Sequence, residues 1–232
     1  MQLKDKVFIL TGAARIGVDV ANELTKQGAK LAVTYMSTKS AVGDLQIQAD
    51  LTNPLDVLRV VSETKQRFGK VDGLIHMAAN YKRTPWKELN EQTWNDSMRP
   101  IARTAFLMTK AVGDELLQNP SCGKIILISD WSVLTQPYKD YLPYNVAKSA
   151  VEGLTKSLAK ELAPKIAVNC IAPGPILMPP DLSVEDNAEV MKNTPLEKWG
   201  GAHEITKAVL YLLDAEFVTG QILFVDGGRS IA

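Results

Sequence analysis

Short runs of apolar and β-branched residues alternate along the chain with longer amphipathic stretches. The short runs predict strands, since they span about four to eight residues and end at turn residues. They are Val7–Leu10, Lys30–Tyr35, Leu45–Ala49, Leu74–Met77, Lys124–Ile128, Ala167–Ile171 and Ile222–Val225. The amphipathic stretches space their apolar residues as helices do. They are Ile16–Lys26, Pro54–Phe68, Trp94–Leu117, Pro143–Ala163 and Glu204–Leu213.

Strands that alternate with helices predict a parallel sheet with helices on both faces, because each crossover between parallel strands uses a helix. A chain of 232 residues suits one such domain. We therefore predict a single-domain α/β fold of the Rossmann type over residues 1–232, with a doubly wound parallel sheet of about seven strands. Residues 173–200 follow the carboxyl end of a strand, where such sheets bind ligands, and we expect them to form a substrate loop.

The link between the second and third predicted strands is short. Tyr35 ends one strand and Leu45 begins the next, whereas a parallel crossover usually takes about a dozen residues or more. We expect an irregular segment here and one helix fewer on that face of the sheet.

Charge and composition exclude several classes of partner. Lys plus Arg and Asp plus Glu both number 26, so no net charge attracts nucleic acid or an anionic membrane. No apolar run approaches the ~18 residues of a membrane span, and the N-terminal residues lack a signal-peptide pattern. Cys122 and Cys170 lie far apart without metal-ligand spacing. We expect a cytoplasmic protein with reduced thiols and no metal.

A loop of small residues follows the first predicted strand and opens the first helix. Its sequence is Thr11-Gly12-Ala13-Ala14-Arg15-Ile16-Gly17. Small residues let backbone N–H groups approach a pyrophosphate, and the helix N-terminus stabilises its charge. A plain structural turn is the alternative, but dinucleotide folds bind their cofactor at the first strand–turn–helix of the chain. The predicted cofactor contacts in this loop are Gly12, Ala14, Arg15, Ile16 and Gly17.

The end of the second predicted strand indicates which dinucleotide is used. Enzymes that prefer NAD place an acidic residue there to bind the ribose 2′-hydroxyl. Residues 34–40 contain no Asp or Glu but offer Ser37, Thr38 and Lys39, and Arg15 lies in the first loop. Cations and hydroxyl donors suit a 2′-phosphate, so we predict NADP(H). The alternative is a solvated loop with an ordinary surface lysine.

Residues further along the chain carry a family resemblance. Asp130, the segment Tyr144-Asn145-Val146-Ala147-Lys148, Asn169 and Pro173-Gly174 occur in an order that resembles the short-chain dehydrogenase/reductase family. The resemblance covers essentially the whole chain. It implies an oxidoreductase with a small-molecule substrate and with Tyr144 and Lys148 as catalytic residues. It implies further cofactor contacts at Asp50, Leu51, Ala78, Ala79, Tyr144, Lys148, Pro173, Gly174 and Ile176.

The resemblance also implies a homotetramer or homodimer that forms through the two long helices. The second of these helices offers an apolar surface beyond the Tyr144 face, which we expect to comprise Ala147, Ala150, Val151 and Leu154.

The spacing of Tyr144 and Lys148 has a chemical consequence. Residues four apart on a helix share a face, so the two side chains are neighbours. A free phenol has a pKa of about 10. A nearby ammonium favours the phenolate and lowers that pKa toward values that are useful for proton transfer.

Three features depart from the family pattern. Asp130 stands where the family has a serine at the end of the fifth strand, and Ile101 stands where it usually has an asparagine. The glycine loop is also one residue shorter than usual. The first two departures affect the usual catalytic residues, and the third affects the binding of the pyrophosphate.

Aspartate in place of serine resembles the pteridine reductase and dihydromonapterin reductase subgroup. That resemblance implies that Tyr81 stacks on the pterin ring, and Arg15 and Tyr141 also match some members. A carboxylate at Asp130 accepts hydrogen bonds from the N–H edge of a pterin, and it raises the pKa of Tyr144 in opposition to Lys148. The alternatives are that Asp130 caps a turn, that Tyr81 packs into the core, or that the extra residue between Asp130 and Tyr144 moves Asp130 away.

Three functions remain open from the sequence. The first is an NADPH-dependent reductase that transfers hydride to a C=N bond of a pteridine, with Asp130, Tyr81 and Tyr141 at the substrate. The second is a carbonyl reductase of the 3-oxoacyl-(acyl-carrier-protein) reductase type, which residues 195–200 resemble. The third is a non-catalytic NADP-binding regulatory protein. Oxidation of NADPH by any substrate separates the third from the others.

Overall fold

A computed structural model describes residues 2–39, 41–180 and 182–232 of the protein. Ser40 and Asp181, which fall in the predicted 2′-phosphate segment and in the predicted substrate loop, lie outside the described residues. Within the described ranges, no helix combines the length and the apolar character that a membrane crossing requires.

Seven parallel strands form one sheet in the order β3-β2-β1-β4-β5-β6-β7. The order reverses between β1 and β4, which confirms the doubly wound α/β arrangement of the Rossmann type. A crevice opens at the carboxyl ends of strands where such an order reverses. The strands are β1 (Val7–Thr11), β2 (Lys30–Tyr35), β3 (Leu45–Gln48), β4 (Gly73–His76), β5 (Gly123–Ile128), β6 (Ile166–Pro173) and β7 (Ile222–Val225).

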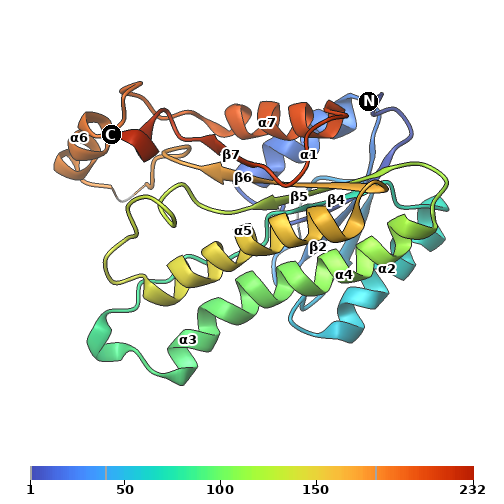
Figure 1. Ribbon diagram of the computed structural model, residues 1–232, viewed down its shortest axis with the longest axis horizontal. Helices are drawn as coiled ribbons and strands as arrows, with labels where there is room; N and C mark the ends of the chain where they lie inside the picture. The colour runs from blue at the N-terminus through green and yellow to red at the C-terminus, as the bar shows by residue number, and fades with distance from the viewer. Residues whose placement is uncertain (1, 40, 181) are drawn as a thin grey trace.

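Helices cover the two faces of the sheet in separate layers (Figure 1). One layer consists of α1 (Ile16–Lys26) and α7 (Ala202–Asp214), and the other contains α2 (Pro54–Phe68), α4 (Thr104–Gln118) and α5 (Leu142–Leu162). Successive strand residues point to opposite layers. Ile9 packs in the apolar cluster under α2, α4 and α5, whereas Phe8 and Leu10 pack in the cluster under α1 and α7. This double burial explains why the strands are continuous apolar runs.

The predicted helix over Trp94–Leu117 is interrupted. It consists of α3 (Glu91–Met98), a π-helical turn η2 (Arg99–Arg103) and α4. Pro100 is the physical reason, because proline has no N–H and its ring displaces the carbonyl four residues earlier. That carbonyl belongs to Asp96, and it accepts a hydrogen bond from the side chain of Asn80 at 2.7 Å.

The segment between β2 and β3 is irregular, as the sequence predicts. The described residues between Tyr35 and Leu45 contain no helix. The side chain of Asp44 accepts a hydrogen bond from the backbone of Leu31 at 2.9 Å and holds the segment against β2. Gly43 has a φ of +90°, and a Cβ there would strike the side chain of Val33. The sheet therefore has no crossover helix between these two strands in the described residues.

The predicted substrate loop contains a helix that the apolar pattern does not reveal. Helix α6 (Val184–Lys192) starts after Ser183, whose hydroxyl accepts a hydrogen bond from the Asp186 N–H at 3.0 Å. None of the residues of α6 is buried. Without a buried stripe the helix needs no apolar periodicity, so only its N-cap marks it in the sequence. Two 3₁₀ turns, η1 (Trp86–Glu88) and η3 (Arg229–Ile231), are likewise absent from the sequence prediction.

The apolar surface that we expected on α5 is partly wrong. Ala147 and Val151 are buried in the core under the sheet, so they are not available to another protomer. The same helix buries Tyr144 and Lys148, and the residues that share their face turn inward with them. Ala150 is exposed, and so is Val146.

Candidate active site

Two adjoining cavities lie at the carboxyl ends of the strands. The first has a volume of about 470 Å³ and is called here the Tyr144 cavity. The second has a volume of about 600 Å³ and is called the Asp50 cavity. Both are lined by Gly12, Ala14 and Arg15, so the loop after β1 separates them. This is the crevice that the strand order predicts.

The loop after β1 lies very close to the end of β4. Gly12 has a φ of +71°, and a Cβ there would lie 2.6 Å from the backbone nitrogen of Ala78. A Cβ on Gly17 would overlap the carbonyl of Gly12. Only glycine fits either position. The loop therefore presents bare backbone at the N-terminus of α1, which suits a pyrophosphate even though the loop is one residue shorter than the family pattern.

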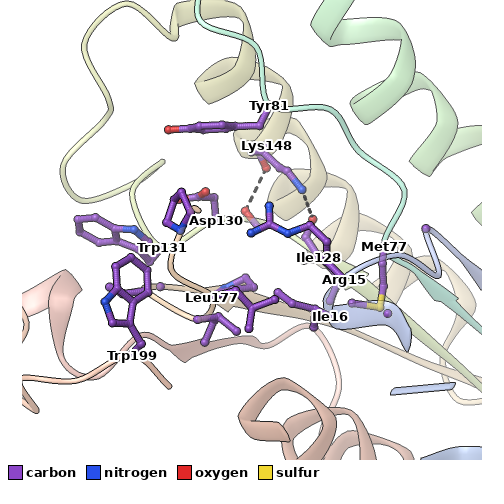
Figure 2. A pocket seen from close by; sticks show the side chains of 18 of the residues that line it. Arg15, Ile16, Met77, Tyr81, Ile128, Asp130, Trp131, Lys148, Leu177 and Trp199 are labelled. Atoms are coloured by element: carbon purple, nitrogen blue, oxygen red, sulfur yellow. Dashed lines mark hydrogen bonds between the residues drawn. The ribbon is translucent and has the colours of Figure 1, made fainter. Parts of the chain in front are cut away.

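Most of the predicted adenosine contacts gather in the Asp50 cavity. They are Ser37, Thr38, Asp50, Leu51, Ala78 and Ala79. Lys39 does not join them: it is exposed and does not line either cavity. Of the two cations proposed for a 2′-phosphate, only Arg15 lines the cavities, and Figure 2 shows its side chain among the residues of the Tyr144 cavity. Of the residues of the β2–β3 segment that were predicted to bind a 2′-phosphate, Ser37 and Thr38 are those that line the Asp50 cavity, and both carry hydroxyl donors.

The remaining predicted site residues, with one exception, line the Tyr144 cavity. They are Ile16, Gly17, Tyr81, Asp130, Tyr144, Lys148, Pro173, Gly174 and Ile176. The exception is Tyr141, which packs on Tyr81 outside the lining.

Tyr144 and Lys148 project from one face of α5, as their spacing predicts. The Tyr144 hydroxyl donates a hydrogen bond to Oδ2 of Asp130 at 2.7 Å. The Nζ of Lys148 donates to the backbone carbonyl of Ile128 at 2.8 Å, at the end of β5 (Figure 2). Both side chains are buried, at 5 % and 4 % exposure. The structure thus brings a phenol, an ammonium and a carboxylate together at one wall of the cavity.

Asp130 has two roles at once. Its Oδ2 accepts from Tyr144, while its Oδ1 accepts from the backbone N–H of Ser132 at 2.9 Å. The carboxylate therefore caps a turn and also bonds to the phenol of Tyr144. The extra residue between Asp130 and Tyr144 does not move Asp130 out of the site.

The surroundings of Tyr144 keep its phenol protonated. Burial raises the pKa of Tyr144 far above its ordinary value, and the charge and hydrogen bond of Asp130 raise that pKa further. The lowering that we expected from Lys148 is not found, whereas the opposing effect of Asp130 is. Burial lowers the pKa of Lys148, and Asp130 partly offsets that lowering. Tyr144 therefore keeps its proton at neutral pH.

Tyrosine rings surround the mouth of the Tyr144 cavity. Tyr81 is 58 % exposed, so it is not a core residue. Its ring stacks on Tyr141 with centroids 4.5 Å apart and meets Tyr144 edge-on at 4.9 Å. Tyr138, which the sequence analysis does not single out, lines the same cavity and accepts a hydrogen bond from the indole of Trp131 at 2.8 Å. The site offers flat apolar surface beside its proton donor.

Comparison with known proteins agrees with this geometry. The family described as Enoyl-(Acyl carrier protein) reductase matches residues 12–230. The chain is 32 % identical to 3-oxoacyl-(acyl-carrier-protein) reductase FabG of Salmonella typhimurium, over 98 % of both chains. It is 31 % identical to 5-keto-D-gluconate 5-reductase of Escherichia coli, over 97 % of this chain and 91 % of that one.

A solved short-chain dehydrogenase/reductase from Serratia marcescens superposes with a TM-score of 0.90 at 27 % identity, covering 99 % of this chain and 100 % of that chain. The chain belongs to the short-chain dehydrogenase/reductase family. It is an oxidoreductase, and enzymes of this family use a nicotinamide dinucleotide. The pteridine reductase subgroup is not among the relatives described here, whose names are closer to the alternative 3-oxoacyl type.

One departure from the short-chain dehydrogenase/reductase pattern is structural in this chain. Ile101, which replaces the usual asparagine, lies in the π-helical turn η2 with a side chain that is 2 % exposed. It packs in the apolar cluster under α5 and carries no hydrogen-bonding group. The usual side-chain amide is therefore missing from this family member.

A buried histidine supports the loop after β1, which separates the two cavities and is called here the partition. The ring of His76, at the end of β4, forms hydrogen bonds with Thr11 at 2.9 Å and with Thr104 at 3.3 Å. Burial lowers the pKa of His76 to about 3, with a further lowering by Lys148. The Thr11 hydroxyl also accepts from the backbone N–H groups of Met77 and Ala78. His76 thus stays neutral and ties β1 to the wall of the Asp50 cavity.

Several residues of the Tyr144 cavity are missed by the sequence analysis. They are Trp131, Tyr138, Trp199 and Arg229. Trp131 has a local signal, because it directly follows Asp130. Trp199 lies within the predicted substrate loop but is not singled out there, and Arg229 reaches the cavity only through the path of the chain after β7.

Proposed function

We propose that this oxidoreductase is an NADP(H)-dependent reductase in which Tyr144 donates the proton. The observation that carries the proposal is the buried, protonated phenol at 2.7 Å from Asp130, on the wall of a cavity that adjoins a dinucleotide-type loop. The glycine loop supports a dinucleotide cofactor, because Gly12 and Gly17 pack too closely against backbone atoms to carry a Cβ and so leave bare backbone at the N-terminus of α1.

The residues of the Tyr144 cavity have different roles in the proposed reduction. The bound dinucleotide supplies the hydride. Tyr144 holds a proton on its hydroxyl and transfers it to the substrate atom on which charge develops. Lys148, held by the carbonyl of Ile128, places a positive charge on the same helix face. Asp130 accepts the hydroxyl proton of Tyr144 in a hydrogen bond and releases it when a substrate atom takes its place.

The substrate that the comparisons favour is a carbonyl compound of the 3-oxoacyl type. The FabG relatives carry that activity in their names, and the ketogluconate reductase also acts on a carbonyl compound. A carbonyl oxygen accepts a hydrogen bond, which matches the donor hydroxyl of Tyr144. The change required is that the hydroxyl turns from Asp130 to the substrate.

A second candidate is a pteridine, and one observation favours it. Asp130 places an acceptor where a ketone reductase uses a hydroxyl donor, and a carboxylate repels a developing oxyanion. The same oxygens suit the N–H edge of a pterin, and the exposed ring of Tyr81 offers a stacking surface next to Tyr144.

One experiment separates the two substrates. Wild-type enzyme and the Asp130→Ser variant are assayed for NADPH oxidation with an acetoacetyl thioester and with dihydrobiopterin. For the 3-oxoacyl substrate we expect thioester reduction by the wild type that is equal or faster in Asp130→Ser. Reduction of dihydrobiopterin alone, weakened by Asp130→Ser, would replace the first candidate with the second. Asp114→Ser, which changes an exposed carboxylate on α4, is the control.

If no NADPH is oxidised with either compound, the proposed reductase activity on these two substrate classes is wrong, and the non-catalytic NADP-binding alternative gains support.

The preference for NADPH over NADH is also a proposal. Among the described residues that line the Asp50 cavity near the end of β2, none is acidic before Asp50, and Ser37 and Thr38 provide donors for a 2′-phosphate. We expect a higher kcat/KM with NADPH than with NADH. An equal or better value with NADH would contradict it.

For the assembly we propose a homodimer or homotetramer through α4 and α5. Phe106, Leu117 and Val146 leave apolar side chains exposed on these helices, at 51 %, 47 % and 40 %. Symmetric closure is the usual way to cover such a surface. Light scattering at micromolar concentration should report more than one chain per particle, and a monomer would overturn the proposal.

A further inference from the structure

The C-terminal end of the chain reaches the Tyr144 cavity. Arg229 follows β7 by four residues, bonds to a residue of α6, and lines the Tyr144 cavity. Its guanidinium carbon sits 5.3 Å above the ring of Trp131, within the range of a cation–π contact. Trp131 is 4 % exposed and directly follows Asp130, and Asp130, Trp131 and Arg229 all line the Tyr144 cavity.

Only one nitrogen of the Arg229 guanidinium donates hydrogen bonds to described residues of the protein. Nη1 donates to the backbone carbonyl of Val190 at 2.6 Å and approaches the Thr194 hydroxyl at 3.4 Å. An arginine has five N–H donors on three nitrogens. In residues 2–39, 41–180 and 182–232, no carboxylate lies within ion-pair distance of it. Arg229 is therefore a half-buried cation with free donors at a cavity wall.

The charges of the Tyr144 cavity favour an anion. Its described lining contains three cations, Arg15, Lys148 and Arg229, and one carboxylate, Asp130. Both oxygens of Asp130 already accept hydrogen bonds from the protein. Arg229 does not line the Asp50 cavity, so it lies away from the adenosine side of the site, and we assign the anion that it would bind to the substrate.

We propose that Arg229 is the residue that selects substrates with a carboxylate, through hydrogen bonds from its free N–H groups. The planar guanidinium, whose central carbon lies 5.3 Å from the centre of the Trp131 ring, presents a fork that matches a carboxylate. Because Trp131 adjoins Asp130 in the chain, the carboxylate should lie within a few bonds of the carbon that is reduced. This inference rests on the proposed carbonyl reductase, and it names small oxo acids, with a free carboxylate, as the carbonyl substrates that Arg229 favours over thioesters.

The kinetic experiment compares matched substrates. Acetoacetate and 4-oxopentanoate are assayed beside their methyl esters, which keep the carbonyl and remove the charge. For wild type we expect a higher kcat/KM with the acids. Arg229→Gln should lower kcat/KM for the acids by about tenfold or more, which corresponds to about 1.4 kcal/mol per decade, and should change the esters by much less. Arg229→Lys, which keeps the charge without the fork, should lie between.

The obvious alternative is that Arg229 only holds α6 through the Val190 carbonyl. In that case Arg229→Gln lowers kcat/KM for acids and esters by the same factor, and the proposal is overturned. Lys207→Gln removes an exposed cation on α7 and is the control for general charge effects. Equal loss in that control would also overturn the proposal.

A binding measurement keeps the inference separate from the proposed activity. Acetoacetate is titrated into the NADPH complex while tryptophan fluorescence is followed, since Trp131 lies beneath Arg229. Saturable quenching that is lost in Arg229→Gln supports the anion site even if no ketone is reduced. Turnover of the esters without any binding or preference for the acids would leave the reductase intact and refute the role of Arg229.

Discussion

The Asp50 cavity and the Tyr144 cavity share one partition but are built in different ways. The Asp50 cavity is lined largely by residues at and after the ends of β1, β2, β3 and β4, most of which have short side chains. The Tyr144 cavity is walled by large side chains from distant segments, among them Tyr81, Trp131, Trp199 and Arg229. A backbone wall depends on turn geometry and accepts few substitutions, whereas a side-chain wall can change one residue at a time. We therefore expect binding of the cofactor to depend mainly on the backbone of the fold, and the choice of substrate to depend on individual side chains.

The largest effect should come from the phenol in the wall of the Tyr144 cavity. Tyr144→Phe keeps the ring but removes the proton and the hydrogen bond to Asp130. We expect kcat to fall by ~10²–10⁴, the usual contribution of a positioned acid, with little change in the dissociation constant of NADPH. Steady-state kinetics and a fluorescence titration of NADPH measure the two quantities. A variant that retains most of its kcat would show that Tyr144 is structural.

The next effect concerns His76 behind the partition, and it is seen in how the free energy of unfolding depends on pH. His76 has a pKa of about 3 when folded and 6.5 as the ordinary value, so below pH 6.5 the unfolded chain binds a proton that the folded chain does not. This group should lower the free energy of unfolding by about 1.4 kcal/mol per pH unit as the pH falls from about 6.5 toward 3. Urea unfolding at several pH values should show a smaller slope for His76→Gln than for wild type.

His203 provides the matched comparison for that prediction. It is the other histidine of the chain, and its side chain is 62 % exposed. His203→Gln should leave the slope between pH 6.5 and 3 unchanged. If both variants behave alike, the histidine at the partition does not control the pH dependence.

The backbone wall is tested at the glycine loop. Gly12→Val places a side chain 2.6 Å from the Ala78 nitrogen and forces a positive φ on a β-branched residue. The left-handed backbone alone costs about 1–2 kcal/mol, so we expect NADPH to bind about tenfold more weakly or worse. Gly113→Ala is the control, because its Cβ would meet Leu162 at an ordinary 3.6 Å. Equal NADPH affinity in all three proteins would contradict the backbone-wall interpretation.

The smallest expected effect concerns one ring of the side-chain wall. Tyr81→Ala removes the exposed ring that meets Tyr144 edge-on. Stacking adds about 0.5–1.5 kcal/mol beyond burial, so the KM of a flat heterocyclic substrate should rise by roughly tenfold. The KM of an acyl thioester and the affinity for NADPH should change much less. A uniform loss for all ligands would mean that Tyr81 supports the fold and not the choice of substrate.

The sequence predicts the first cavity better than the second for a physical reason. Gly12, Gly17 and the irregular link after Tyr35 are visible as local patterns, because turns and crossovers are short-range features. Tyr144 and Lys148 are also local, since one helix carries both. Arg229 and Trp199 reach the cavity through long-range topology, which no local sequence pattern reveals. Helix α6 has no buried face, so its sequence shows no apolar periodicity. Lys39 shows the converse error: its sequence position suggests a phosphate contact, yet its side chain is exposed and lines neither cavity.

The irregular segment between β2 and β3 has a consequence for the timing of the reaction. Without a crossover helix in its described residues, the rim of the Asp50 cavity is a single short strand-to-strand connection held by Asp44. A dinucleotide can then leave past its adenine end without waiting for a large element to swing aside. We therefore expect the hydride step, and not departure of the spent cofactor, to limit turnover. NADPH that carries deuterium at the transferred position should slow kcat, and not only kcat/KM.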